Sequence, residues 1–279
     1  MAEESFDDSS TGAMHPTNDA EAHTSSARPV LQAQGLSKAF GAVQALRDVD
    51  LEVNAGEVIG LVGDNGAGKS TLVKILSGVY IPDSGQISID GARVNITNPK
   101  DATKAGIATV YQDLALCDNL DVVTNLFLGR EERTTIIPFL VRPLNTLSME
   151  LQAASVLKQL DVKLPSLRSP VANLSGGQRQ SIAVAKTILR KAKVVLLDEP
   201  TAALGVAQTR QVLDLIRRLR TQGLAVVVIS HNLADIFEVV DRVVVMRLGR
   251  RVATFDIATT TPEQVVAAIT GAEFGNLAS

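Results

Sequence analysis

The sequence has little of what would place a protein in a membrane, in an oxidising compartment or on a nucleic acid. Its single cysteine, Cys117, excludes an internal disulfide and suits a reducing compartment. No apolar run approaches the roughly 18 residues of a membrane-spanning helix, and the N-terminus lacks the apolar segment of a signal peptide. The net charge of −3 gives no electrostatic reason to expect nucleic acid as a partner. These absences favour a soluble, cytoplasmic protein.

One local concentration of positive charge needs a separate explanation. A helix is predicted over residues 206–221, and it carries four arginines: Arg210, Arg217, Arg218 and Arg220. Apolar residues recur on the same helix at the spacing of a buried face. We therefore interpret the arginines as its solvated side and not as a nucleic-acid surface.

The most informative segment is the run Gly-Asp-Asn-Gly-Ala-Gly-Lys-Ser over residues 63–70, between an apolar strand and a helix. Glycines let consecutive backbone N–H groups turn toward one anion, and the following helix adds its positive N-terminal end. The lysine reaches the outer phosphates, and the Ser70 hydroxyl can bind Mg²⁺. The structural alternative is a glycine-rich turn. The nucleotide-binding residues predicted here are Gly63, Asp64, Asn65, Gly66, Ala67, Gly68, Lys69, Ser70 and Thr71.

Strand and helix signals alternate along most of the chain, which predicts an α/β fold. Three uniformly apolar runs, 194–197, 225–229 and 243–246, are typical of strands covered on both faces in a parallel sheet. Helices are predicted over 206–221 and 233–239. Strands at 31–36 and 46–53, with a hairpin of 86–89 and 94–96 around Asp90-Gly91, predict an antiparallel β subdomain.

The remaining segments set the expected boundaries. Residues of about 114–191 are helical in pattern and predict an inserted helical subdomain. Residues 1–29 are rich in Ser, Thr, Asp, Glu and Ala, so we expect a disordered tail. The folded domain is then expected over 30–271, with Thr261-Pro262 opening a last helix and Gly271 closing it, followed by a short tail over 272–279.

Two acidic residues follow the apolar run 194–197. A carboxylate at the end of a buried strand, downstream of a phosphate loop, suits a magnesium-bound group, so Asp198 is the second predicted metal residue. Glu199, one residue on, is placed to accept a proton from an attacking water. The alternative is a strand that ends in two solvated acids before a proline.

The segment Leu-Ser-Gly-Gly-Gln over residues 174–178 predicts a second anion site. Ser175 and Gln178 form a capping box at the start of a helix predicted over 179–190. That box does not require Gly176 and Gly177, which cost backbone entropy. Exposed N–H groups at this helix start indicate that a phosphate is gripped from two sides.

Taken together, the order of phosphate loop, Gln112, Leu-Ser-Gly-Gly-Gln, Asp-Glu-Pro and His231 resembles the nucleotide-binding subunit of an ATP-binding cassette (ABC) transporter. The resemblance covers about residues 30–271. It implies a P-loop NTPase (RecA-like) core, with ATP and Mg²⁺ as cofactors. It also implies that ATP lies between the phosphate loop of one copy and the signature, Ser175 to Gln178, of a second copy.

The resemblance assigns three further residues. Phe40 matches the aromatic that stacks on adenine, with an ordinary core phenylalanine as the alternative. Gln112 matches a glutamine that contacts the metal or the attacking water, and His231 matches the switch histidine at the γ-phosphate. One departure is Gly205, which stands where most members carry an aspartate that crosses the dimer interface.

The chain is most similar to subunits of simple-sugar importers (ribose, xylose or fructose), both in Gly205 and in the segment 125–131. The resemblance implies a homodimer at the cytoplasmic side of the cell membrane, bound peripherally to permease subunits and linked indirectly to a sugar-binding protein. The permease groove is expected near Gln112 and residues 114–130. Import of another solute, such as branched-chain amino acids, or a soluble ABC ATPase acting on DNA or ribosomes, are the alternatives.

Overall fold

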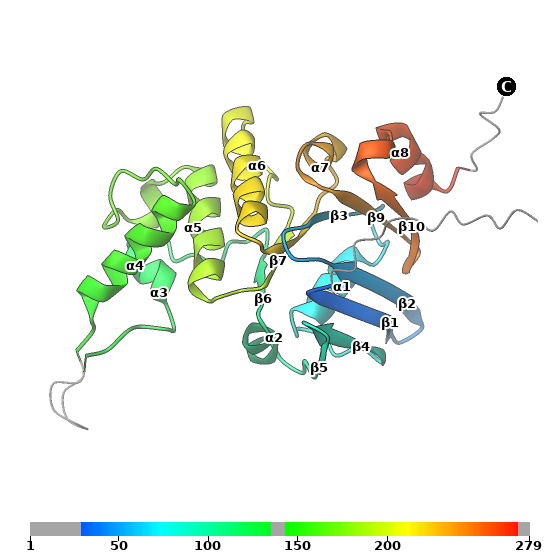
Figure 1. Ribbon diagram of the computed structural model, residues 1–279, viewed down its shortest axis with the longest axis horizontal. Helices are drawn as coiled ribbons and strands as arrows, with labels where there is room; N and C mark the ends of the chain where they lie inside the picture. Colours follow the sequence, from blue (N-terminus) through cyan, green and yellow to red (C-terminus); the bar gives the residue numbers. More distant parts are fainter. Residues whose placement is uncertain (1–28, 135–142, 273–279) are drawn as a thin grey trace, which may run out of the picture.

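The computed structural model describes residues 29–134 and 143–272. Figure 1 shows the two sheets at one end of the molecule and the helices α3, α4 and α5 at the other. The predicted tails, 1–29 and 272–279, lie almost wholly outside the described residues. In the described part of the chain, no helix has both the length and the apolar character needed to cross a membrane.

A six-stranded sheet forms the core of the molecule. Its spatial order is β10-β9-β3-β8-β7-β6, with β10 antiparallel to β9 and the other pairs parallel. The strands are β3 (Val58–Val62), β6 (Ile107–Val110), β7 (Val194–Asp198), β8 (Ala225–Ile229), β9 (Arg242–Arg247) and β10 (Arg250–Asp256). The parallel sheet predicted from the three apolar runs is confirmed, because all three are strands of it.

Alternate residues of these strands pack on opposite faces of the sheet. Val195 and Leu197 of β7 join the cluster beneath α5 to α8, whereas Val194 and Leu196 join the cluster around α1 and the second sheet. Both sets are almost completely buried. A strand buried on both faces has no polar side, which is why its sequence is uniformly apolar.

The second sheet is antiparallel, in the order β2-β1-β4-β5. Its strands are β1 (Leu31–Phe40), β2 (Val43–Val53), β4 (Ser84–Ile89) and β5 (Ala92–Val94). The hairpin is confirmed, but its second strand begins two residues earlier than predicted and ends at Val94. Asp90 (φ 51°) and Gly91 (φ 77°) form the two-residue turn, which pairs Ile89 with Ala92 and leaves Ile96 beyond the strand.

Helices cover the faces of the core sheet and form the inserted subdomain. They are α1 (Lys69–Leu76), α2 (Pro99–Ala105), α3 (Val122–Phe127), α4 (Thr146–Gln159), α5 (Gly176–Leu189), α6 (Val206–Thr221), α7 (Leu233–Val239) and α8 (Pro262–Thr270). The bounds of α6 and α7 are those predicted. Between residues 114 and 191, the described chain contains α3, α4, α5 and a short 3-10 turn at Val171–Asn173, joined by irregular segments. The predicted cap of α8 is present, with Gln264 accepting from the Thr261 N–H at 3.0 Å.

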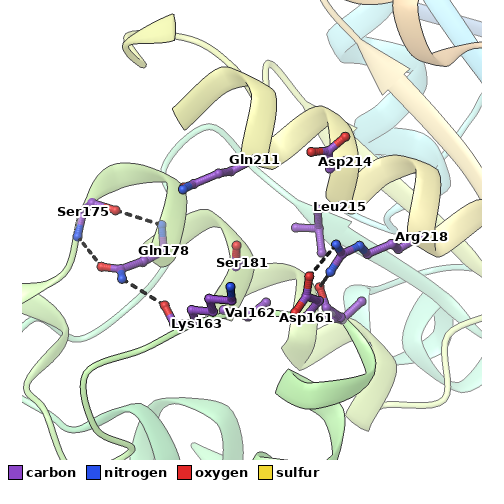
Figure 2. A pocket seen from close by; sticks show the side chains of 11 residues that line it. Asp161, Val162, Lys163, Ser175, Gln178, Ser181, Gln211, Asp214, Leu215 and Arg218 are labelled. Atoms are coloured by element: carbon purple, nitrogen blue, oxygen red, sulfur yellow. Dashed lines mark hydrogen bonds and ion pairs between the residues drawn. The ribbon is translucent and has the colours of Figure 1, made fainter. Parts of the chain in front are cut away.

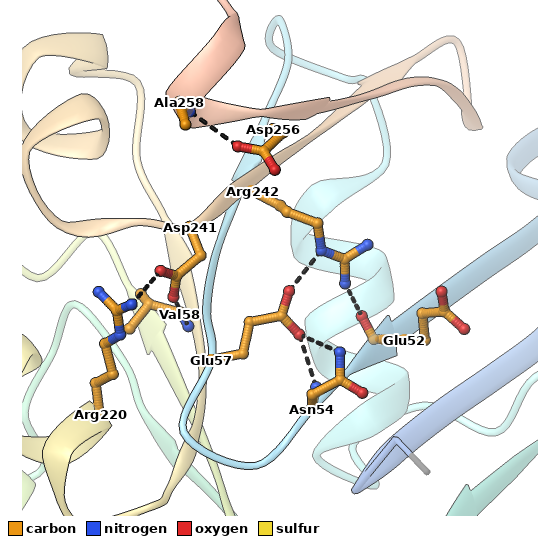
Figure 3. Close-up of polar contacts among 9 residues, drawn as sticks. All are labelled: Glu52, Asn54, Glu57, Val58, Arg220, Asp241, Arg242, Asp256 and Ala258. Atoms are coloured by element: carbon orange, nitrogen blue, oxygen red, sulfur yellow. Dashed lines mark hydrogen bonds and ion pairs between the residues drawn. The ribbon is translucent and has the colours of Figure 1, made fainter. Parts of the chain in front are cut away.

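Polar side chains fix the start of β3, the strand that leads to the phosphate loop (Figure 3). The Val58 N–H donates to Asp241 Oδ2 at 2.9 Å, and Arg220 of α6 pairs with the other oxygen of the same carboxylate at 2.5 Å. Beside it, Arg242 of β9 pairs with Glu57 at 2.5 Å. The loop that follows β3 therefore starts from a strand anchored to β9 and to α6.

We predict that Gly60→Ala destabilises the fold. A Cβ at Gly60, in the middle of β3, would lie 2.9 Å from Cγ2 of the fully buried Ile236. Overpacking of this kind costs about 1–3 kcal/mol, measured as a lower free energy of unfolding in denaturant. Gly205→Ala is the control, because nothing lies within 4 Å of a Cβ there. Equal free energies for the two variants would contradict the prediction.

Candidate active site

The phosphate loop runs from the end of β3 to the first residue of α1. Gly63 has φ 148°, and a Cβ there would lie 2.2 Å from the Met246 carbonyl oxygen. Gly68 has φ 104°, and a Cβ there would lie 2.7 Å from the Ala45 carbonyl oxygen. Both positions combine a left-handed backbone with contact to a neighbouring strand, so only glycine fits. The loop is therefore pressed against the backbone of its neighbours, with its N–H groups at the start of α1.

Lys69 closes this loop from the helix side. Its Nζ donates to the carbonyl oxygens of Gly63 at 2.6 Å and Asp64 at 3.0 Å. Burial lowers the pKa of Lys69, whereas the charges of Glu199, Asp64 and Asp198 act in the opposite direction. The ammonium group is thus held over the loop among carboxylates, where an incoming phosphate would replace weaker carbonyl partners.

The two predicted carboxylates lie at the carboxyl end of β7, as expected. Burial, followed by the charge of Glu199, raises the pKa of Asp198, and the charges of Lys74 and Lys69 oppose this rise. Glu199 has φ 51°, an uncommon backbone for a residue with a side chain, and its N–H donates to the Ile229 carbonyl at 2.9 Å. Two adjacent acids in a partly buried place favour binding of a cation.

His231 lies next to the predicted base. Its Nδ1 is 2.9 Å from Glu199 Oε2, and its side chain is 77% exposed, whereas that of Glu199 is only 19% exposed. Residues 32 positions apart therefore meet because β7 and β8 are neighbours and both end at this edge. The sequence placed each of them after a strand, but it did not show that they touch.

The signature segment lies in the helical subdomain, at the start of α5, while the phosphate loop lies in the core at α1 (Figure 1). The predicted capping box is present. The Gln178 N–H donates to Ser175 Oγ at 3.3 Å, and the Ser175 N–H donates to Gln178 Oε1 at 3.0 Å. The same glutamine donates from Nε2 to the Lys163 carbonyl at 3.0 Å. Within one chain, the structure does not bring the phosphate loop and the signature segment together.

The two glycines of the signature lie close to the start of α6. A Cβ at Gly176 would lie 2.7 Å from Leu204 Cδ2, and one at Gly177 would lie 2.9 Å from Gln211 Oε1. Both neighbours belong to α6 or to the segment that leads into it. The sequence analysis missed this contact, because nothing in the spacing of the two segments shows that they touch.

Phe40 is the last residue of β1, and its side chain is 43% exposed. Its ring meets Tyr80 edge-on, with 5.1 Å between ring centroids, and the Lys38 ammonium lies 5.6 Å from the centroid of Phe40. The alternative of a fully buried core phenylalanine is wrong. A ring supported on its edge and partly open to solvent offers a surface for stacking.

Gln112 lies just beyond β6, after a strand as predicted, and it is exposed. The loop that follows it depends on Asn125, which is fully buried. The Asn125 side chain accepts from the Cys117 N–H at 2.7 Å and donates to the carbonyls of Cys117 and Leu120 at 2.9 and 3.1 Å. Asn125 was expected in a segment facing a permease, but its side chain holds this loop from within.

Gly205 precedes α6 and has an ordinary φ of −74°. Its N–H donates to Gln208 Oε1 at 3.3 Å, which caps the helix. Nothing within 4 Å would oppose a Cβ at this position. Neither the backbone nor packing therefore requires the glycine that replaces the usual aspartate.

A family model described as ABC transporter matches residues 46–202, which are 157 of the 279 residues of the chain. This chain belongs to the ABC transporter family. Its α/β P-loop NTPase fold and its class, an ATP-hydrolysing transporter subunit, are those predicted from the sequence. The roles of individual site residues stay predictions.

Relatives in the family are similar along nearly the whole described chain. The fructose import ATP-binding protein of Rhizobium meliloti is 44% identical over 88% of this chain and 95% of its own length. The xylose/arabinose import ATP-binding protein of Sulfolobus acidocaldarius is 42% identical over 89% and 96%. A ribose import ATP-binding protein of Caldanaerobacter subterraneus is 40% identical over 88% of this chain, which spans only 48% of that protein.

Solved structures support the fold. A nucleotide-free ATP-binding cassette from an ABC transporter has a TM-score of 0.72 at 24% identity, covering 87% of this chain and 96% of that one. The ADP conformation of an ATP-binding cassette has a TM-score of 0.71 at 24% identity, with 87% and 95% covered.

We predict that Gly63→Ala weakens nucleotide binding more than Gly66→Ala does. Both glycines have positive φ, but only at Gly63 would the new Cβ meet a carbonyl oxygen, whereas nothing lies within 4 Å of Gly66. Gly63→Ala must therefore displace the loop from β9, while Gly66→Ala strains the loop locally. Titration with a fluorescent ATP analogue measures both dissociation constants. The same affinity for the two variants would show that the contact with β9 does not shape the loop.

Proposed function

We propose that this chain is the ATP-hydrolysing subunit that energises import of a simple sugar through a membrane permease. The observation that carries this proposal is the meeting of Lys69, Glu199 and His231 at one edge of the core sheet, in a chain similar over almost its full described length to fructose and xylose/arabinose import proteins. No observation favours an amino-acid substrate or a role on DNA or ribosomes.

The phosphate loop holds the nucleotide in this proposal. Gly63 and Gly68 leave no room for side chains, so backbone N–H groups face the phosphates, and Lys69 exchanges its carbonyl partners for phosphate oxygens. Phe40 stacks on the adenine through the part of its ring that is open to solvent. The loop therefore binds the phosphates, while the aromatic ring binds the base.

Mg²⁺ fits the oxygen ligands present. Ser70 at the start of α1, Asp198 at the end of β7 and exposed Gln112 offer hydroxyl, carboxylate and amide oxygens. Oxygen ligands of this kind suit Mg²⁺, which in nucleotide sites relies on one or two side chains and on phosphate oxygens. When bound, the ion neutralises phosphate charge, and it would also relieve the unfavourable ionisation of Asp198.

Glu199 is the proposed general base. Its carboxylate accepts a proton from the water that attacks the γ-phosphate, as the bond between the β- and γ-phosphates breaks. His231, 2.9 Å away, holds the carboxylate in place and faces the γ-phosphate side. The positive φ of Glu199 fixes the direction in which its side chain leaves β7.

A second copy of the chain completes the site. Because the signature at the start of α5 and the phosphate loop at α1 lie in different parts of one chain, each signature serves the nucleotide of the partner in an inverted homodimer. Similar cassettes form dimers, including one described as a dimeric post-hydrolysis state with bound ADP and phosphate, at a TM-score of 0.66 and 24% identity. ATP binding closes the dimer, and hydrolysis reopens it.

The permease subunits take up this motion at the cytoplasmic side of the membrane, where the chain is peripheral. Their docking groove lies near Gln112 and the segment 114–130, which Asn125 holds in shape. A sugar-binding protein delivers the cargo to the permease, so the sugar does not contact this chain.

We predict that Glu199→Gln retains ATP binding but lowers turnover by about 10²–10⁴-fold, the usual contribution of a general base. Phosphate release measures turnover, and an ATP titration measures binding. Lys69→Ala is the matched variant, because its defect is expected in ATP binding. Loss of a charge-assisted hydrogen bond to phosphate weakens binding by about 10–100-fold. Near-normal turnover of Glu199→Gln would remove Glu199 from its proposed role.

We also predict that Leu128→Asp uncouples transport from hydrolysis. Leu128 is 37% exposed at the end of α3, in the helical subdomain and away from the phosphate loop at α1, so its replacement should spare basal ATPase activity. Sugar uptake by vesicles containing the reconstituted transporter should fall. Val266→Asp on α8 is the control, since Val266 is also exposed, at 44%, but lies in a different part of the molecule. Full uptake with Leu128→Asp would contradict the proposed groove.

A further inference from the structure

Besides the apolar packing of α5 on α6, two further contacts join the helical subdomain to α6 or to the segment before it, and Figure 2 shows the second of them. In the first, the signature glycines pack against Leu204 and Gln211 near the start of α6. The second lies two turns further along this helix, where the Arg218 guanidinium donates to the Leu160 carbonyl and to Asp161 Oδ2, the latter at 2.7 Å. The arginines of α6 are therefore more than a solvated face.

The second contact uses the exposed end of α4. That helix ends at Gln159, and Asp161 follows with φ 51°, at the position where glycine usually closes a helix. The last carbonyls of a helix attract a cation, and Arg218 satisfies one of them while it pairs with the carboxylate beside it. Its hydrogen bond and charge also hold the pKa of Asp161 below the usual range. Among the described residues, this is the only ion pair between 114–191 and the rest of the chain.

A short path leads from this ion pair to the signature serine. Two residues after Asp161, the Lys163 carbonyl accepts from Gln178 Nε2 at 3.0 Å. Gln178 in turn forms the capping box with Ser175. A displacement of residues 160–163 would therefore be transmitted through Gln178 to Ser175, which is proposed to face the nucleotide of the partner copy.

On its other side, α6 is anchored to the core. Arg217, next to Arg218, pairs with Glu238 of α7 at 2.6 Å. Arg220 pairs with Asp241, which holds the start of β3 (Figure 3). The helix that carries Arg218 is thus fixed to the strand that leads into the phosphate loop.

Between the two contacts lies a cavity of about 260 Å³, lined by residues of 160–163, α5 and α6. Figure 2 shows Gln211 and Arg218 on the α6 side, with Ser175 and Gln178 across the cavity. Leu160 is fully buried in the same apolar cluster as the inner face of α6, and Val162 packs against that cluster, so apolar packing holds one side of the 160–163 turn. On the side of the cavity, Arg218 supplies the polar contact between this turn and α6.

We propose that Arg218 is a positioning residue for ATP hydrolysis. By holding Leu160 and Asp161 it sets the orientation of the signature relative to the phosphate loop, and so the fit of Ser175 to the nucleotide of the partner. This inference rests on the proposed function, in which the signature of one copy completes the site of the other.

Asp161→Gly is the sharpest test. It removes the carboxylate that pairs with Arg218, while glycine relieves the positive φ at the end of α4. Lys191→Gly is the matched control, because Lys191 has φ 54° at the same position after α5. We expect Asp161→Gly to lower kcat by about 2–30-fold, the range for residues that couple sites without contacting a ligand. ATP affinity and the unfolding temperature should match those of Lys191→Gly.

Two substitutions of Arg218 should lower kcat to different extents. Arg218→Ala should lower kcat at least as much as Asp161→Gly. The kcat of Arg218→Lys should lie between that of Arg218→Ala and that of the unmodified protein. A lysine ammonium cannot reproduce the geometry in which the guanidinium binds both the Leu160 carbonyl and the Asp161 carboxylate. All kcat values come from phosphate release by the full chain, and ATP affinity comes from nucleotide titration.

Ser175→Arg in the same assay separates the two proposals. If Ser175→Arg abolishes hydrolysis and Asp161→Gly keeps the kcat of Lys191→Gly, Arg218 has no positioning role and the two-copy site stands. Equal losses of kcat in Asp161→Gly and Lys191→Gly also overturn the inference, since any change at a helix end would then suffice. If Ser175→Arg hydrolyses ATP normally, the two-copy site fails, and the role of Arg218 fails with it.

Discussion

The site depends on the close approach of backbones around β3. At Gly60, Gly63 and Gly68, a single added Cβ would meet Ile236, the Met246 carbonyl or the Ala45 carbonyl at 2.9 Å or less. The phosphate loop is thus shaped by strands β9 and β2 on either side, and not by its own sequence alone. Such rigidity is needed because N–H groups bind an anion well only when they converge before it arrives.

Charge supplies the second constraint. Lys69 is partly buried among Asp64, Asp198 and Glu199, so the folded chain brings together the groups that are proposed to face phosphate and metal. Burial is the main cause of the raised pKa of Asp198, and the charge of the neighbouring Glu199 adds to it. Neighbouring carboxylates of this kind cost stability when unpaired, and a bound cation removes the cost. Binding of a cation at these carboxylates would therefore also stabilise the fold.

The sequence predicted those features that local pattern determines. The bounds of α6 and α7 followed from the helical pattern and from Gly223 and Asp241, which come shortly after their ends. The uniformly apolar runs predicted the parallel sheet. Contacts between distant segments were not predictable from spacing. The buried role of Asn125, the packing of Gly177 on Gln211 and the pairing of Arg218 with Asp161 all join residues whose meeting depends on the tertiary arrangement.

The same arrangement gives Gly205 a context. The segment before α6 packs on the signature through Leu204, while α6 itself is tied to the core through Arg217 and Arg220. An aspartate would fit sterically at Gly205, so its absence reflects no constraint of the fold. In the proposed homodimer, a chain without that carboxylate would have one fewer contact across the interface. The position of the signature would then depend more on contacts within each copy, which residues near both ends of α6 provide.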